Sequence, residues 1–285
     1  MRYQFIAEHR HEYPITLMCQ VLSVSVSGFY AWTKRLPSRR SREDAYLAEQ
    51  VKTVFQANRG VYGSPRVHVE LRDQGIACAR KRVARLMREQ ELFAKRPRHR
   101  TITTKSEPDA QVAPNLLERN FSAEQPNTKW VADTTYIWTA EGWLYLAVVL
   151  DLFSRMVVGW SMAAIQDASL VVQALRMAIA RRRPQAGLLH HSDRGSTYTS
   201  ESYQALLQQK SIIASMSRTA DCYDNAAMES FFHSFKGECI DSQSFQTRAQ
   251  ARCVTFDYIE TFYNRTRRHS TLHYMSPLMY EQLMC

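Results

Sequence analysis

The stretches WVADTTYI (Trp130–Ile137) and GWLYLAVVLDLFS (Gly142–Ser154) decide the fold. Both are rich in β-branched and aromatic residues, and the first alternates between apolar and polar positions, as a strand does. A third such stretch, MVVGWSM (156–162), follows after a short connection. Short connections join antiparallel neighbours, so these segments predict a three-stranded antiparallel meander.

Helical and strand patterns alternate after the meander. SLVVQALRMAIARR (169–182) and TSESYQALLQQK (199–210) have helical periodicity, whereas GLLHHSD (187–193) and SIIASMS (211–217) are short apolar strands. A last helix is expected within SRTADCYDNAAMESFFHSFKGE (217–238). The order β-β-β-α-β-α-β-α predicts an α/β fold with a mixed five-stranded sheet, in which sites form at the carboxyl ends of the parallel strands.

Three acidic residues stand where such a site would form. Asp133 lies within the first strand, Asp193 ends the fourth, and Glu229 lies on the last helix. Clustered carboxylates suit Mg²⁺ or Mn²⁺, and two such ions can activate a nucleophile and stabilise the leaving oxygen of a phosphodiester. Each acid alone also has an ordinary reading, Asp151 is a rival ligand, and Asp224 is expected to cap the last helix.

Positive charge is concentrated in the front of the chain. Residues 1–107 hold 21 Lys and Arg against 10 Asp and Glu, a balance of +11, and the remainder hold 16 against 17, which is −1. The two values sum to the net charge of +10. A basic front favours a polyanion partner such as nucleic acid, although a solvated basic surface explains charge alone nearly as well.

The front half reads as short helices. Residues 15–35 and 64–90 each resemble a helix-turn-helix, and 42–57 forms another amphipathic helix. Ser64 is expected to cap the helix that begins with Pro65 and ends at Gly75. Lys81, Arg85 and Arg88 share one face of the following helix, and we interpret them as DNA contacts.

These patterns divide the chain into four regions. We expect a helical DNA-binding region at 1–95, a linker rich in Pro, Ser and Thr at 96–128, a catalytic core at 129–240 and a helical extension at 241–285. No apolar run approaches membrane-spanning length, and no secretory signal is visible. The six scattered cysteines favour a reduced chain in the cytoplasm.

The sequence resembles DDE-type insertion-sequence transposases, specifically the downstream-frame product (OrfB) of the IS-three family. The resemblance covers nearly the whole chain. Asp193 and Glu229 are separated by 35 residues, the spacing of that family and of retroviral integrases. His273 stands where glycine is usual. The motifs that carry this resemblance are WVADTTYI, LYLAVVLDLFSRMVVGW, HHSDRGSTYTS, SMSRTADCYDNAAMESFFHSFKGE and YIETFYNRTRRHSTLHYMSP.

The resemblance implies an RNase H-like core with Asp133, Asp193 and Glu229 as catalytic metal ligands. It implies hydrolysis of a phosphodiester at an element end, followed by attack of the freed 3′-OH on a second phosphodiester. Double-stranded DNA is the expected substrate, in the bacterial nucleoid. An upstream-frame OrfA protein is the expected fusion or partner, and a dimer or higher oligomer is expected on DNA. The alternatives are a catalytically silent DNA-binding regulator and a general RNase H-like nuclease.

Further basic side chains are candidates for contact with DNA. Lys236 and His233 lie seven and four residues after Glu229, on the same helix face, and Arg194 follows Asp193. The segment YNRTRRHS (263–270) has two interpretations. Either it clamps DNA through Arg265, Arg267, Arg268 and His269, or it closes the fold by hydrogen bonds of Tyr263, Asn264 and His269. His190 and His191 are interpreted as a structural pair at a strand end.

Overall fold

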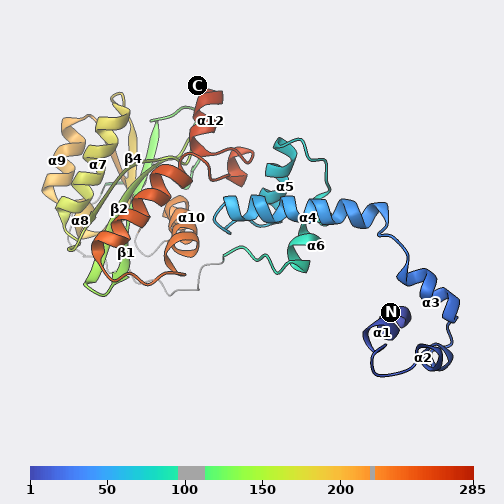
Figure 1. The fold of residues 1–285 in the computed structure, drawn as a ribbon. Helices are drawn as coiled ribbons and strands as arrows, with labels where there is room; N and C mark the ends of the chain where they lie inside the picture. The colour runs from blue at the N-terminus through green and yellow to red at the C-terminus, as the bar shows by residue number, and fades with distance from the viewer. Residues whose placement is uncertain (96–112, 219–221) are drawn as a thin grey trace.

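A five-stranded mixed sheet forms the centre of the larger lobe (Figure 1). The computed structural model describes residues 1–95, 113–218 and 222–285. The sheet order is β3-β2-β1-β4-β5, with β1 antiparallel to β2, β2 antiparallel to β3, and β1, β4 and β5 parallel. The predicted meander and sheet class are therefore confirmed. The strands are β1 (Lys129–Thr139), β2 (Gly142–Asp151), β3 (Val157–Ala163), β4 (Leu189–Ser192) and β5 (Ile213–Met216).

The two faces of the sheet bury separate cores. Alternate residues of β1 point to opposite faces, so Trp130 packs beneath one set of helices and Val131 beneath the other. The first face is covered by α7 (Ala168–Arg182), α8 (Ser196–Thr199) and α9 (Glu201–Gln209). The second is covered by α10 (Ala226–Phe235) and the helices that follow it.

The C-terminal extension is helical, as expected, and continues the second layer. The 3-10 turn η1 (Cys222–Asn225) leads into α10, which runs on into the π-helix η2 (Lys236–Ile240). Phe231, Phe235 and Tyr258 are fully buried between α10, the extension and the sheet. The remaining elements are α11 (Arg248–Phe256), the π-helix η3 (Asp257–Tyr263), the 3-10 helix η4 (Ser270–Leu272) and α12 (Pro277–Met284).

The front half forms two helical units. The first has its own small core around Phe29 and stands apart at the end of α4 (Figure 1). The second, which includes Leu47 and Val51 of α4, shares one continuous core with the catalytic layer, and the rings of Tyr62 and Phe262 lie against each other across the junction. The units are α1 (Arg2–Glu8), α2 (Ile15–Val21) and α3 (Val26–Thr33), then α4 (Arg39–Ala57), α5 (Ser64–Asp73) and α6 (Arg80–Glu89).

Local details refine the sequence expectations. Gly63, not Ser64, precedes the first turn of α5, so the Ser64 cap was wrong. Gly75 ends that helix at φ +79°, a left-handed conformation that glycine adopts without steric cost. The predicted boundaries at 95, 128 and 240 stay predictions, and most of the linker lies outside the described residues.

No single helix among the described residues is long and apolar enough to cross a membrane. The bent pair α2 and α3, which meet at 113°, passes the length and composition test only when the two are taken together. The described cysteines at 19, 78, 239, 253 and 285 are free thiols.

Candidate active site

Two aspartates lie side by side where β1 and β4 run parallel. Val131 pairs with His191 in this register. Asp133 lies two residues further along β1, and Asp193 directly follows Ser192, the last residue of β4. The two lie close enough for the charge of Asp193 to raise the pKa of Asp133. Asp133 faces the same side of the sheet as Val131, the side that α10 covers. Backbone amides hold them, because Thr134 N–H donates to Asp133 Oδ1 (2.7 Å) and Gly195 N–H donates to Asp193 Oδ1 (3.0 Å).

The helix that carries Glu229 is attached to β1 next to Asp133. Asn225 immediately precedes α10, and its side-chain amide donates to the carbonyl of Ala132 (3.3 Å). Met228 is fully buried, which fixes the rotation of the helix and leaves Glu229 exposed. The start of α10 is therefore anchored one residue from the aspartate pair.

The three carboxylates interact electrostatically. Burial raises the pKa of Asp133 to about 8, and the charges of Asp193 and Glu229 add to that rise, whereas Thr134 N–H and Lys236 oppose it. Burial also raises the pKa of Asp193 and of Glu229. Carboxylates with raised pKa values in close proximity indicate a site that lacks compensating positive charge.

An all-carboxylate donor set fits a hard divalent cation such as Mg²⁺ or Mn²⁺. Among the described residues, no three acidic, histidine or cysteine side chains already converge as a metal cage. The fit therefore rests on the register of Asp133 and Asp193 and on their unmet charge, with Glu229 on the adjoining helix. Asp151 is excluded as a rival ligand, because it is fully buried and accepts from the backbone N–H groups of Asn127 and Phe153.

The chain matches known families and proteins over almost all of its length. Residues 123–222 and 229–284 match integrase core domains, and residues 41–100 match an HTH-like domain. Transposase InsF for insertion sequence IS3A of Escherichia coli (strain K12) is 44% identical over 283 residues, which cover 99% of this chain and 98% of InsF. The chain belongs to the IS3 family of insertion-sequence transposases. Its integrase core makes it a DDE-type polynucleotidyl transferase.

Two further matches accompany InsF. The uncharacterized 31 kDa protein of insertion element IS600 from Shigella sonnei is 43% identical, over 93% of this chain and 97% of its own length. The HTLV-2 integrase catalytic core domain in complex with magnesium matches with a TM-score of 0.41 and 17% identity, over 55% of this chain and 97% of that chain.

Near the carboxylates of this IS3-family transposase, the predicted cations have distinct environments. Lys236 lies close enough to lower the pKa of Asp133, and its Nζ is 4.7 Å from the ring centre of Tyr136. His233 is exposed on the last turn of α10. Arg194 is half-buried and donates to the carbonyl of Ser217 (2.6 Å), so it braces the neighbouring loop. Contact of these three with DNA stays a prediction.

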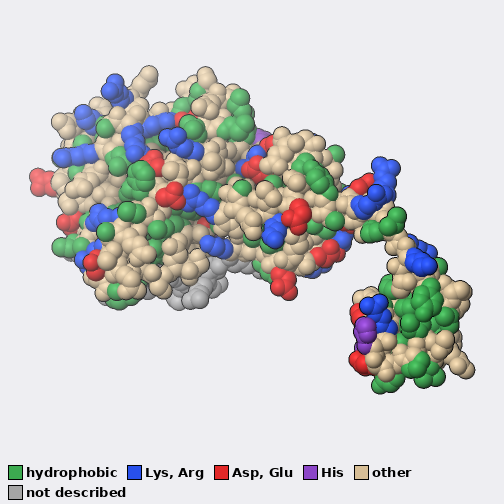
Figure 2. Space-filling model, viewed as in Figure 1, with side chains coloured by type: hydrophobic (Ala, Val, Ile, Leu, Met, Phe, Trp, Pro, Cys, Tyr) green, Lys and Arg blue, Asp and Glu red, His purple; other side chains and the backbone are tan. Residues whose placement is uncertain are grey.

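The face of α6 is less cationic than its sequence suggests. Arg85 pairs with Asp44 (2.7 Å) and with Glu89 (2.8 Å), so we reassign it from a DNA contact to the packing of α4 against α6. Lys81 and Arg88 are exposed and stay candidates. Figure 2 shows Lys and Arg side chains interspersed with acidic ones on the visible face, not one continuous basic surface.

In 263–270, the fold-closing alternative is correct for two of the three arginines. Arg267 is 3% exposed and forms a bidentate pair with Glu238. Arg268 pairs with Glu70 (2.6 Å) on α5. The prediction that Arg267 and Arg268 clamp DNA was therefore wrong, because both guanidinium groups form ion pairs within the protein. Arg265 is exposed and stays a candidate.

The remaining predictions concern polar groups beside the site. The pair His190 and His191 is structural, as expected: both side chains are buried, and burial lowers their pKa values to about 3 and about 4. Asp224 does not cap α10. Instead, it accepts from Arg218 N–H (2.9 Å) and from the side chain of Asn115 (2.8 Å).

Sequence reasoning missed Tyr198. Its hydroxyl is buried without a hydrogen-bond partner among the described residues. Burial raises its pKa, and the charges of Tyr203, Asp133 and Asp193 add to that rise. Its place five residues after Asp193, in HHSDRGSTYTS, is the only signal that marked it.

Proposed function

We propose that the transposase cleaves the ends of its element and transfers the freed 3′-OH ends to a second phosphodiester, in a reaction that depends on Mg²⁺ or Mn²⁺. One observation carries the proposal: the parallel register of β1 and β4 sets Asp133 beside Asp193 with unmet negative charge. A binding module needs no such pair, because it costs stability and contributes no DNA affinity.

Asp133, Asp193 and Glu229 would hold two divalent ions, with Glu229 turning its exposed side chain towards the pair. Bound ions supply charge neutralisation at the scissile phosphate and lower the pKa of the attacking oxygen. The protein supplies position, since Asp133 is fixed on β1, Asp193 directly follows β4, and both accept hydrogen bonds from backbone amides. Lys236 is proposed to contact a phosphate beside the carboxylates, because its charge acts on Asp133.

The proposed substrate is double-stranded DNA that carries the terminal repeats of the element, together with target DNA. Two chains are needed to hold two ends, so we propose a homodimer or higher oligomer on DNA, acting at the bacterial nucleoid in the cytoplasm. An upstream-frame OrfA protein, as a fusion or a separate partner, is proposed to assist the recognition of the ends. Lys81, Arg88 and Arg265 are the proposed contacts outside the active site.

The test uses labelled duplexes with the end sequences of the element, incubated with Mg²⁺, Mn²⁺ or EDTA. We expect metal-dependent nicking and joining by the wild type, and a loss of at least roughly a thousandfold in Asp193→Asn and Glu229→Gln. Binding of the same duplexes in Ca²⁺ should persist in both variants, which separates chemistry from folding.

Two results would point elsewhere. Binding without cleavage by the wild type, alone and as an OrfA fusion, would favour a silent regulator. Cleavage of any duplex or RNA–DNA hybrid without joining would favour a general nuclease.

A further inference from the structure

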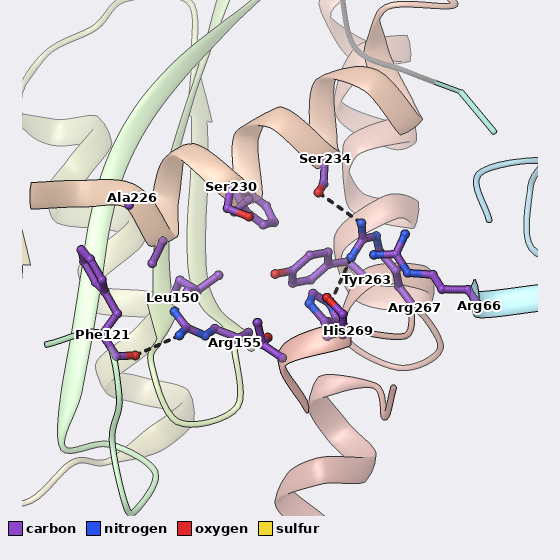
Figure 3. Close-up of a pocket in the computed structure, with 14 residues that line it drawn as sticks. Arg66, Phe121, Leu150, Arg155, Ala226, Ser230, Ser234, Tyr263, Arg267 and His269 are labelled. Atoms are coloured by element: carbon purple, nitrogen blue, oxygen red, sulfur yellow. Dashed lines mark hydrogen bonds between the residues drawn. The ribbon is translucent and has the colours of Figure 1, made fainter. Parts of the chain in front are cut away.

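A cavity on the flank of the catalytic core is lined by three arginines (Figure 3). Its volume is about 280 Å³. Four segments that are distant in sequence form its walls: Arg66 comes from α5, Arg155 from the turn between β2 and β3, Ser230 and Ser234 from α10, and Arg267 and Thr271 from the C-terminal extension.

The positive charge of this cavity exceeds the negative charge. Glu238 accepts two hydrogen bonds from Arg267, so its charge is balanced by that residue. Arg66 and Arg155 form no ion pair with an acid in the part of the chain that the structure describes. Arg155 donates only to the carbonyl of Phe121 (2.9 Å), and Arg66 stacks on the ring of Tyr62 (5.6 Å from its centre). Two guanidinium groups are therefore left without a directly paired carboxylate, and only the more distant charges of Glu238 and Asp151 act on them.

The pKa values of the side chains in and beside the cavity reflect the same excess of positive charge. Burial lowers the pKa of both Arg66 and Arg155, and the charge of Arg267 lowers that of Arg66 further. His269 lies between them, and burial together with all three arginine charges holds its pKa well below the usual range. An arginine does not lose its proton in a protein, so a partly buried, uncompensated pair is costly until an anion enters.

We propose that this cavity binds a phosphate group. Planar guanidinium groups match phosphate oxygens bidentately, and the hydroxyl groups of Ser230, Ser234 and Thr271 add neutral donors around the rim. Ser230, Ser270 and Thr271 are exposed, so the cavity opens to solvent. The phosphate comes either from a DNA backbone or from a free phosphate compound. The DNA source rests on the proposed function, and the free source does not.

Such a ligand would join the two halves of the protein. Arg66 belongs to the HTH-like region, whereas Arg155 belongs to the integrase core. Ser230 follows Glu229 on α10, so the bound phosphate would also contact the helix that carries the third carboxylate. The phosphate would thereby stabilise the position of α5 relative to the active site.

The test measures inorganic phosphate binding to the full-length chain, by calorimetry and by thermal unfolding at constant ionic strength. We expect phosphate to raise the unfolding midpoint of the wild type and of Arg176→Gln, an exposed arginine on α7. Arg66→Gln and Arg155→Gln should bind phosphate roughly tenfold more weakly or worse, because each loses charge-assisted hydrogen bonds.

Thr271→Glu guards against misfolding of the arginine variants. It brings a carboxylate to the exposed rim, where it should pair with the arginines, raise the unfolding midpoint and abolish the phosphate effect. Gln208→Glu, at an exposed position on α9 outside the cavity, is the matched acidic control and should respond to phosphate as the wild type does.

A duplex-binding arm separates the two sources. If phosphate competes with duplex in the wild type but not in Thr271→Glu, the source is DNA, and if duplex binding is equal in both, the source is a free phosphate compound. Absence of any phosphate effect, with equal duplex binding, would overturn the proposal. Phosphate binding by Asp193→Asn is expected to be intact, so failure of the cleavage assay leaves this result standing.

Discussion

Asp133 is the residue at which folding and chemistry conflict most. A buried carboxylate close to another one is stable there when it is protonated or when a cation is bound. The register that brings the pair together is the same one that buries Trp130 and Val131. The sheet therefore enforces the repulsion, and relief must come from outside the chain.

This conflict predicts a pH-dependent stability. The pKa of Asp133 is about 8 when folded and near 3.8 otherwise, so the native state keeps a proton that the unfolded chain loses. Its stabilising contribution is complete below about pH 4 and is lost as pH rises through about 8. In EDTA, the free energy of unfolding of the wild type should fall by about 1–3 kcal/mol more than that of Asp133→Asn between pH 5 and 8, after allowance for solvent screening.

Urea unfolding across that pH range measures the difference between the two proteins. Addition of Mg²⁺ at pH 8 should restore wild type and leave Asp133→Asn unchanged. If the free energies of unfolding of the two proteins change equally with pH in EDTA, the charges of Asp133 and Asp193 are already compensated within the chain.

Glu238 offers a second residue-scale prediction. It receives two hydrogen bonds from Arg267 and one from Tyr258, all in the interior. Glu238→Gln leaves a buried guanidinium without its charge partner, so we expect a loss of about 3–5 kcal/mol in the free energy of unfolding. Chemical denaturation measures it. Glu201→Gln, an exposed acid on α9, should change stability by less than about 0.5 kcal/mol, and an equally small effect at Glu238 would contradict the assignment.

At the scale of elements, the close approach of α7 to β3 depends on Gly159. A Cβ at this position would collide with the carbonyl of Ala174 and lie 2.6 Å from the nitrogen of Ala178, both in the helix backbone. Gly159→Ala should therefore push α7 outward and cost about 1–3 kcal/mol or more. Thermal unfolding measures the cost.

Gly63→Ala is the control for this substitution, since the nearest atom to its Cβ is 3.7 Å away. Its cost should stay below about 1 kcal/mol. Equal effects at the two glycines would mean that α7 yields without strain.

The elements themselves were largely predictable, because each strand and helix carries its own periodicity. The carboxylate triad was also foreseen, through strand ends and the spacing of Asp193 from Glu229. The ion pairs between elements were not predictable. The sequence cannot show that Arg85 pairs with Asp44 or that Arg268 pairs with Glu70, because each pair joins separate elements. His273, where glycine was expected, does adopt the left-handed conformation (φ +53°) that glycine favours.

At the scale of the whole molecule, the α1–α3 unit and the main body have independent cores. Deletion of residues 1–37 should therefore leave the free energy of unfolding of the body unchanged within about 0.5 kcal/mol. Circular dichroism during urea unfolding measures it. Deletion of residues 1–58 also removes Leu47 and Val51 from the main core and should prevent cooperative folding. A large loss on the shorter deletion would show that the units support each other.

On the proposed function, the length of α4 sets a distance along DNA. Its 19 residues extend about 28 Å, and one base pair of B-form DNA rises about 3.4 Å, so the helix spans roughly eight base pairs. A duplex held by the α1–α3 unit would thus be held most of a helical turn of DNA away from the far end of α4. Lengthening α4 by one turn of helix should move the cut by roughly one to two base pairs, as a ruler would.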